Sequence, residues 1–142
     1  MEKNKEKNKE NIINDVIVFP YTIDESKNIK DIGLFVSEND YLTVITGKYK
    51  DIDVTILETA KRIFDDECNC NISDDQYWKY IGDVTDGKVN YSGFIVNVSD
   101  FFKDNAGISS ENIKWKPVSY LMKTDDVFIS AIIMKIFIIY YM

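Results

Sequence analysis

Runs of β-branched and aromatic residues, separated by short polar stretches, dominate the chain from residue 12 to residue 118. Such runs predict strands, because branched side chains fit the half-buried surface of a pleated sheet. The predicted strands span residues 12–21, 32–37, 41–46, 77–83, 89–98 and 113–118. Polar turns at residues 38–40 and at Asp86-Gly87 are expected to close two hairpins. We expect the first strand to end at Pro20 and the last at Pro117, since proline lacks the N–H that a strand ladder needs.

A helical periodicity replaces this pattern in the middle of the chain. Thr55, followed three residues later by Glu58, is typical of a capping box and places a helix start near Ile56. At about 100° per residue, one arc of this helix is apolar. Its members are Ile56, Leu57, Ala60, Ile63, Phe64 and Cys68. Asn69 can adopt the left-handed conformation that ends a helix.

The order of elements predicts an α+β fold with helices packed on a mixed sheet. A closing helix is expected over residues 125–142, where Asp125 and Asp126 favour the positive end of the helix dipole. The chain of 142 residues suits one domain. Residues 1–11 repeat Glu-Lys-Asn-Lys and have no apolar face, so we expect a flexible charged tail there and a single domain over residues 12–142.

Composition narrows the possible functions. The chain has no histidine, which removes the usual general base and most zinc sites. A net charge of −7 argues against a nucleic-acid duplex as the main partner, because phosphate binding needs a basic surface. Cys68 and Cys70 are too close for an unstrained disulfide, and the N-terminus is charged rather than apolar. Both features predict an intracellular, cytoplasmic protein. The many Lys, Asn and Ile residues suggest an AT-rich genome, and a viral source would make the protein a virion component.

Carboxylates gather near the end of the first helix. On the helical wheel, Asp66 lies at the edge of the apolar arc and Glu67 lies inside it. A carboxylate on the apolar side is costly unless it is paired, lies at the fraying helix end, or binds a cation. Ile63 lies between the two, and a carboxylate there would complete a cluster suited to Mg²⁺ or Mn²⁺. The alternative is a solvated acidic run, in which Arg62 only forms i,i+4 pairs with Glu58 or Asp66.

Residues 62–70, Arg-Ile-Phe-Asp-Asp-Glu-Cys-Asn-Cys, resemble the second half of the signature of the Nudix hydrolase family. That half reads Arg-Glu-hydrophobic-x-Glu-Glu-x-Gly-hydrophobic. Arg62 matches the arginine, Asp66 and Glu67 match the paired glutamates, and Asn69 replaces the glycine. Segment 32–46 lies where the family has its first strands. Segments 79–82 and 91–96 resemble its later strand pair, and segment 114–121 is similar to the stretch before its last helix. The resemblance covers roughly residues 12–137 and implies a Nudix-like mixed sheet between helices, an α/β/α sandwich.

The chain departs further from the signature at three other positions. Ile63 replaces the glutamate that the family mechanism treats as a central metal ligand. Val54 occupies the position of an earlier glutamate, and Lys48 that of the opening glycine. Gly47 is adjacent and would fit only with a one-residue change in the loop.

For an active chain, the resemblance implies hydrolysis of a nucleoside diphosphate derivative, with Mg²⁺ or Mn²⁺ polarising the pyrophosphate and activating water. Asp66 and Glu67 would be the metal ligands. Arg62 and Glu67 would be the catalytic residues, with Arg62 orienting a carboxylate through a charge-assisted hydrogen bond. The carboxylate lost at Ile63 could be replaced from elsewhere in the chain. The candidates are Glu58, Asp65, Asp100 and Asp104.

Because of Ile63, our first hypothesis is a Nudix-fold protein with a degenerate catalytic helix, acting as a non-catalytic binding or structural module in a larger assembly. The alternatives are a working hydrolase and a sensor that binds a nucleotide without cleaving it. Five aromatic residues could stack a nucleobase, or could instead pack across strands. They are Tyr77, Trp78, Tyr80, Tyr91 and Trp115.

The last sixteen residues, 127–142, are almost wholly apolar. This is shorter than the stretch of about 20 residues that spans a membrane, and Lys135 lies near its middle. One face of the helix can pack on its own sheet, while the other faces need a second surface. The pattern therefore favours a protein partner or self-association through this helix over a membrane.

Overall fold

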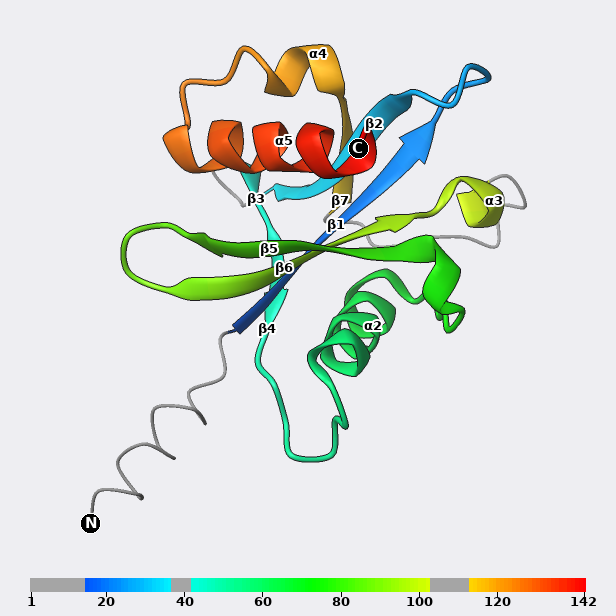
Figure 1. Ribbon diagram of the computed structural model, residues 1–142, viewed down its shortest axis with the longest axis vertical. Coiled ribbons are helices and arrows are strands. Elements are labelled where there is room, and N and C mark those ends of the chain that lie inside the picture. The colour runs from blue at the N-terminus through cyan, green and yellow to red at the C-terminus, as the bar shows by residue number, and fades with distance from the viewer. Residues whose placement is uncertain (1–14, 37–41, 103–112) are drawn as a thin grey trace.

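A computed structural model describes residues 15–36, 42–102 and 113–142 (Figure 1). The predicted tail over residues 1–11, the turn at 38–40 and Asp104 lie outside these described residues. The strands are β1 (Asp15–Ile23), β2 (Ile29–Val36), β3 (Leu42–Thr43), β4 (Ile45–Gly47), β5 (Trp78–Thr85), β6 (Asn90–Asn97) and β7 (Ile113–Pro117). The helices are α2 (Ile56–Cys68), the 3-10 helix η1 (Asp75–Tyr77), α3 (Ser99–Phe102), α4 (Val118–Leu121) and α5 (Val127–Tyr140).

Seven strands of the described chain form one mixed sheet. Its main order is β3-β2-β1-β6-β5, with β4 paired to β1 and β7 paired to β2. The pairing of β1 with β6 is parallel, and the other pairings are antiparallel. The hairpin of β5 and β6 turns at Asp86-Gly87, where Gly87 has a φ of 96°, a conformation that glycine adopts without strain. This hairpin confirms the predicted turn.

Alternating side chains of β1 supply a separate core on each face of the sheet. Val16 and Val18 pack with α2, whereas Ile17 and Phe19 pack with α5. Figure 1 shows α2 on one side of the strands, and α4 and α5 on the other. The sheet is thus enclosed between helices, and the predicted α/β/α sandwich is confirmed.

The prediction that the first strand ends at Pro20 is wrong, because β1 continues to Ile23. On one side, β1 pairs with β6 from Asp15 to Tyr21. Its antiparallel partners change along its length: β4 pairs with residues 16–18, and β2 pairs with Tyr21 and Ile23. Pro20 falls between these two ladders, where a missing N–H leaves no hydrogen bond unmade. At the other position, β7 ends at Pro117 as expected.

The closing helix is shorter than expected. Residues Val118–Leu121 form the separate helix α4, too short for a helical periodicity to reveal. Helix α5 then begins at Val127, and the carboxylate of Asp126 accepts hydrogen bonds from the N–H groups of Phe128 and Ile129. Among the described residues, no helix is long and apolar enough to cross a membrane.

Candidate functional site

The loop between β4 and α2 carries a buried carboxylate that the sequence pattern did not single out. Asp53 accepts two hydrogen bonds from the Arg62 guanidinium, from Nε to Oδ1 at 3.1 Å and from Nη2 to Oδ2 at 2.9 Å. The Thr59 hydroxyl and the Lys50 N–H donate to Oδ2 at 2.9 and 3.0 Å. Four donors therefore satisfy one carboxylate, which is the condition under which a buried charge is stable.

The electrostatics of this pair favour both charges. The hydrogen bond from Arg62 is the largest influence on Asp53 and lowers the pKa of its carboxyl from 3.8 to about 2, although burial acts in the opposite direction. The same contact raises the pKa of Arg62. At neutral pH, Asp53 and Arg62 therefore form a permanent ion pair.

The hydrogen bonds of the Arg62 side chain go to this loop and not to the acidic end of its own helix. Its Nη2 also donates to the Lys48 carbonyl at 2.7 Å, and the Tyr49 hydroxyl donates to the Asp53 carbonyl at 2.9 Å. Its other acidic neighbour, Asp66, is exposed and lies 3.9 Å from Nη1. The proposed i,i+4 pair with Asp66 is thus present, but it is weak beside the bidentate contact with Asp53.

Ile63 faces the core, at the position where the family signature places a metal-ligand glutamate. Its side chain is only 4% exposed and belongs to the cluster between α2 and the sheet. A Cβ added to Gly47 would lie 2.6 Å from Cγ1 and 2.7 Å from Cδ1 of Ile63. The isoleucine therefore lies directly against the Gly47 backbone, which leaves no room for a larger residue on β4.

Asp66 and Glu67 lie three and four residues after Ile63 on α2. The expectation that Glu67 lies within the buried arc is wrong, since both carboxylates are exposed. Glu67 belongs to the last turn of α2, one residue before Cys68. Of the three conditions under which a carboxylate is tolerated on the apolar side, a position at the helix end is therefore met. Across the described residues, no three His, Cys, Asp or Glu side chains are placed to hold a metal ion. Among the described residues here, Ile63 is apolar and the Asp53 carboxylate already accepts four hydrogen bonds, so neither adds a free oxygen ligand. Asp66 and Glu67 as ligands of Mg²⁺ or Mn²⁺ stay a prediction.

A polar hollow of about 340 Å³ lies beside Asp53 and Arg62 and holds two of the replacement candidates, Glu58 and Asp65. Its Lys61 donates to the Ser73 carbonyl at 2.7 Å and pairs with the Asp75 carboxylate. A third candidate, Asp100, accepts a hydrogen bond of 3.3 Å from the Tyr77 hydroxyl. Asp100 thus has a local partner, and among the described residues none of these carboxylates joins Asp66 and Glu67 in one cluster.

The aromatic candidates have partners within the protein. The Trp78 indole is buried, donates to the Ile72 carbonyl at 2.9 Å and meets Phe64 edge-on at 6.0 Å. Tyr80 lies against Phe94 across the β5–β6 pair, with ring centroids 5.3 Å apart. The remaining rings also have neighbours: Tyr77 packs against Phe101, Tyr91 against Phe128, and Trp115 under Gly33. Their arrangement supports cross-strand and core packing, and nucleobase stacking stays a prediction.

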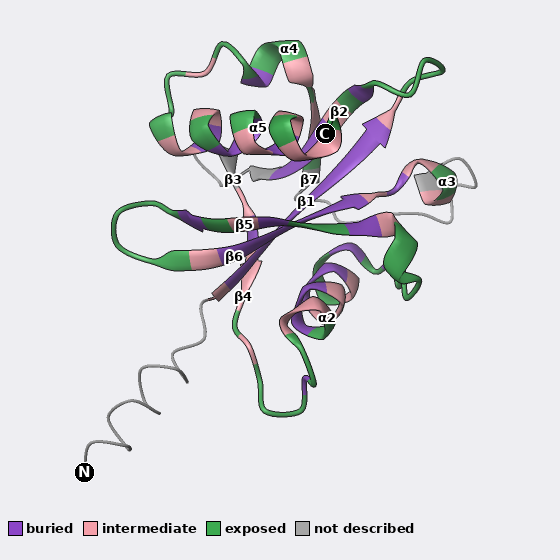
Figure 2. Ribbon diagram, in the orientation of Figure 1, coloured by how far each residue is buried: buried purple, intermediate pink, exposed green. Residues whose placement is uncertain are grey.

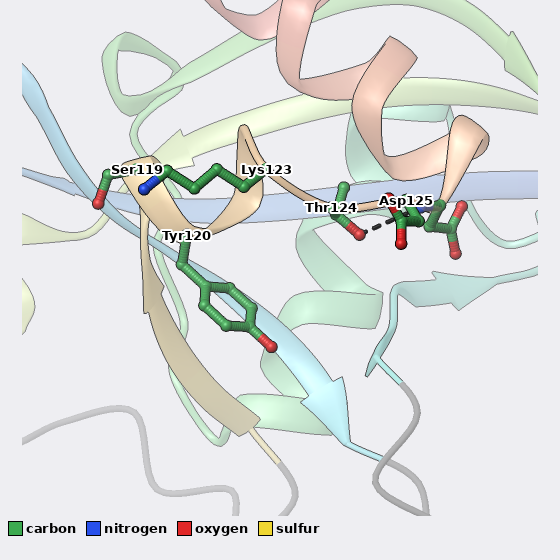
Figure 3. A pocket seen from close by; sticks show the side chains of 6 residues that line it. Ser119, Tyr120, Lys123, Thr124 and Asp125 are labelled. Atoms are coloured by element: carbon green, nitrogen blue, oxygen red, sulfur yellow. Dashed lines mark hydrogen bonds between the residues drawn. The ribbon is translucent and has the colours of Figure 1, made fainter.

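A larger open hollow, about 930 Å³, lies far from Arg62, at the α4–α5 connection on the opposite face of the sheet (Figures 1 and 3). Its lining comprises Ser119, Tyr120, Lys123, Thr124, Asp125 and Asp126. The Asp126 N–H donates to the Thr124 hydroxyl at 3.2 Å, the contact dashed in Figure 3. Sequence reasoning assigned this region no role beyond helix capping.

No protein-family model and no curated protein matches the sequence, but solved structures resemble the fold. NrtR of Shewanella oneidensis is 14% identical with a TM-score of 0.63, covering 85% of this chain and 60% of NrtR. A candidate NUDIX hydrolase from Listeria monocytogenes is 16% identical with a TM-score of 0.58. The match covers 86% of this chain and 90% of the hydrolase. The Ap4A hydrolase of C. elegans is 15% identical with a TM-score of 0.57. The match covers 92% of this chain and 100% of the Ap4A hydrolase. The chain therefore has a Nudix-like fold, as the resemblance implied.

One comparison bears on the expected partners. The chain spans about 60% of the length of NrtR, and NrtR has also been solved in complex with a 27mer DNA. The comparisons therefore do not support the expectation that no nucleic-acid duplex binds. That expectation stays a prediction from the net charge of −7.

The structure also explains two of the departures from the family signature. Lys48 and Val54 have the same spacing as Gly47 and Asp53. In the structure Gly47 lies against α2 and Asp53 binds Arg62, so the motif is shifted by one residue in this loop. One additional residue between Asp53 and Arg62 accounts for both mismatches. Both mismatches are displaced by one residue in the same direction, and this shared displacement was the sequence signal that could have identified Asp53.

Proposed function

We propose that this protein does not hydrolyse nucleotides and acts as a Nudix-fold binding or structural module in a larger assembly. The burial of Ile63 against Gly47 is the observation that carries the proposal. A side chain that is 4% exposed and apolar supplies neither charge nor an oxygen ligand at this position.

The chemistry of pyrophosphate cleavage explains why this one position matters. A divalent cation is needed to polarise the phosphoryl oxygens and to generate the nucleophile from water. Mg²⁺ demands near-octahedral oxygen coordination and is reluctant to lose its waters, so a reduced ligand set holds it weakly. Asp66 and Glu67 are exposed, and no third carboxylate joins them among the described residues. Misplacement of a reacting group by about 1 Å can lower a rate on the order of 100-fold.

The Asp53–Arg62 network supports a structural role for the same helix. Arg62 joins α2 to the preceding loop through Asp53 and the Lys48 carbonyl. This connection needs no metal, because each charge is neutralised by its partner. A helix that is fixed in this way remains ordered while serving as part of a binding surface.

The test is product release from a panel of nucleoside diphosphate derivatives with Mg²⁺ or Mn²⁺. We expect no release by the wild-type protein. Release that appears in Ile63→Glu would support the proposal, since it would identify the single missing ligand. Release by the wild type that disappears in Glu67→Gln would overturn the proposal and establish a hydrolase.

A matched control separates the charge of the new side chain from its size. Ile63→Gln introduces a side chain of the same shape as glutamate without the charge. Mg²⁺ should raise the unfolding temperature of Ile63→Glu but leave the wild type and Ile63→Gln unchanged, since only a bound ligand stabilises the folded state. If Mg²⁺ raised the unfolding temperature of the wild type but not that of Glu67→Gln, the proposal would be contradicted even without detectable turnover.

A further inference from the structure

Helix α5 presents an apolar stripe on the side turned away from its own sheet, and Tyr141, directly after the helix, adds an exposed ring. We call Val127, Ala131, Met134, Ile138 and Tyr141 the outer stripe; all five are exposed. Val127 is 81% exposed, and Met134 and Ile138 are 63% and 60% exposed. The opposite side of α5 is buried through Ile129, Ile132, Ile133 and Ile136. Figure 2 shows this division as purple toward the strands and green on the far side.

The outer stripe lacks the charges that a water-facing helix normally carries. Lys135 is the one charged residue of α5, and its ammonium donates to the Asp83 carbonyl at 2.8 Å. It is therefore drawn toward β5 and away from the stripe. A contiguous apolar surface of this kind on a soluble domain marks an interaction site.

The spacing of the stripe indicates what would cover it. Its members recur at alternating intervals of four and three residues, the seam of a two-helix coiled coil. We infer that a second copy of this chain packs antiparallel on α5, so that the two outer stripes form a symmetric dimer interface. This names the partner for the assembly role in the proposed function, but it depends on α5 and not on the loss of hydrolysis at α2.

The stripe is complementary in size to its own antiparallel copy. With the two-fold axis between Ile132 and Ile133, Val127 faces the partner's Ile138, and Ala131 faces the partner's Met134. Each layer then sets a small side chain against a large one, which is how facing helices interdigitate without voids. The same surface serves on both copies, as a two-fold interface requires.

The end of the stripe meets the hollow at the α4–α5 connection. In this register, the partner's Tyr141 passes Val127 and lies beside Thr124, which lines the hollow of Figure 3. Tyr141 is already held in place, because its ring stacks on Phe137 at 5.7 Å and its hydroxyl oxygen lies 3.2 Å from Asn28 Oδ1. A preordered side chain loses little conformational freedom on binding.

The exposed area is of the size that a dimer needs. Tyr120 and Met122 near α4, 52% and 63% exposed, and Met142, 88% exposed, are further exposed apolar side chains on the elements next to the stripe. Together with the stripe, these eight side chains offer on the order of 600–1,000 Å² if each contributes about half of what a buried aromatic ring does. Specific interfaces bury roughly 800 Å² per partner.

Light scattering coupled to size-exclusion chromatography tests the dimer with the full chain. The wild type should elute with twice the mass of one chain, and Met134→Lys should elute as a monomer. Ile52→Lys is the matched control, because Ile52 is an exposed aliphatic residue, 79% exposed, on the loop before α2. It should remain a dimer. Circular dichroism checks that all three proteins are folded.

Disulfide crosslinking tests the register, since Cys68 and Cys70 are buried and should not interfere. Val127→Cys mixed with Ile138→Cys should form a crosslinked pair, while Val127→Cys alone should not. Crosslinking of Val127→Cys with itself would overturn the antiparallel arrangement. A monomeric wild type would overturn the dimer. A monomer that sediments with phosphatidylcholine vesicles would overturn it as well, because a membrane surface would then cover the stripe. None of these results would alter the hydrolysis test, so the two proposals can fail separately.

Discussion

Asp53 is the residue that ties the loop before α2 to the helix. Its carboxylate accepts hydrogen bonds from the Arg62 guanidinium, the Thr59 hydroxyl and the Lys50 N–H. Removing its charge would leave the half-buried guanidinium of Arg62 without its counter-ion, and partly buried charges lose stability when a partner is removed.

Asp53→Asn should lower the free energy of unfolding at pH 7 by about 2 kcal/mol. The pKa of Asp53 in the folded protein is about 2, below its ordinary value of 3.8. The stabilisation by the carboxylate is therefore complete above the ordinary pKa and declines as the pH falls from 3.8 toward 2. Urea unfolding of wild type and variant across this range should give curves that converge at the acidic end.

The control for this prediction is Asp51→Asn, because Asp51 is an exposed aspartate of the same loop. Its stability should stay within about 0.5 kcal/mol of the wild type at each pH. A loss in Asp53→Asn that is as large near pH 2 as at pH 7 would show that the effect comes from packing and not from charge.

At the scale of the element, α2 is delimited by its two caps. The Thr55 hydroxyl accepts a hydrogen bond of 3.1 Å from the Glu58 N–H, and Asn69 ends the helix with φ 53° and ψ 44°. Both caps were predicted, because capping depends on residues within one turn of each other. The sequence pattern places the loop before the helix one residue out of register, because a loop has no periodicity that reveals an additional residue.

Asn69→Gly should leave the free energy of unfolding unchanged or raise it by up to about 1 kcal/mol, while Asn69→Ala should lower it by about 1 kcal/mol. Glycine has no Cβ to clash in the left-handed region, and alanine does. Thermal unfolding of the variants measures the order of stability. The same pair of changes at Asn71, which has no positive φ, should not favour glycine. An alanine variant at position 69 as stable as the glycine variant would refute this account of the cap.

At the scale of the whole molecule, two cores share one sheet. Phe64 on the α2 face and Ile132 on the α5 face are each almost completely buried. Both cores contact β1, through Val16 and Val18 on one face and Ile17 and Phe19 on the other. Loss of either core should therefore weaken the strand on which the other depends.

Phe64→Ala should lower the free energy of unfolding by about 3–5 kcal/mol and Ile132→Ala by about 2–5 kcal/mol, each in one cooperative transition. Fluorescence of Trp78 and Trp115, which belong to or pack against the cluster with Phe64, reports mainly on the α2 face. Far-ultraviolet circular dichroism reports on all elements. The two signals should change together in both variants. Ile52→Ala, at an exposed position, should change the stability by less than about 0.5 kcal/mol. Separate transitions in Ile132→Ala would mean that α5 unfolds independently.

The sequence by itself determined the strand pattern, the caps of α2 and the apolar arc that packs α2 on the sheet. These depend on side-chain alternation and on hydrogen bonds between near neighbours, which can be read along the chain. Only the tertiary structure decided that Pro20 remains inside β1, that Glu67 is exposed and that Asp53 is the partner of Arg62. It likewise decided which face of α5 is left uncovered. These outcomes depend on which distant segments meet, and contacts between distant segments have no signature in a local pattern.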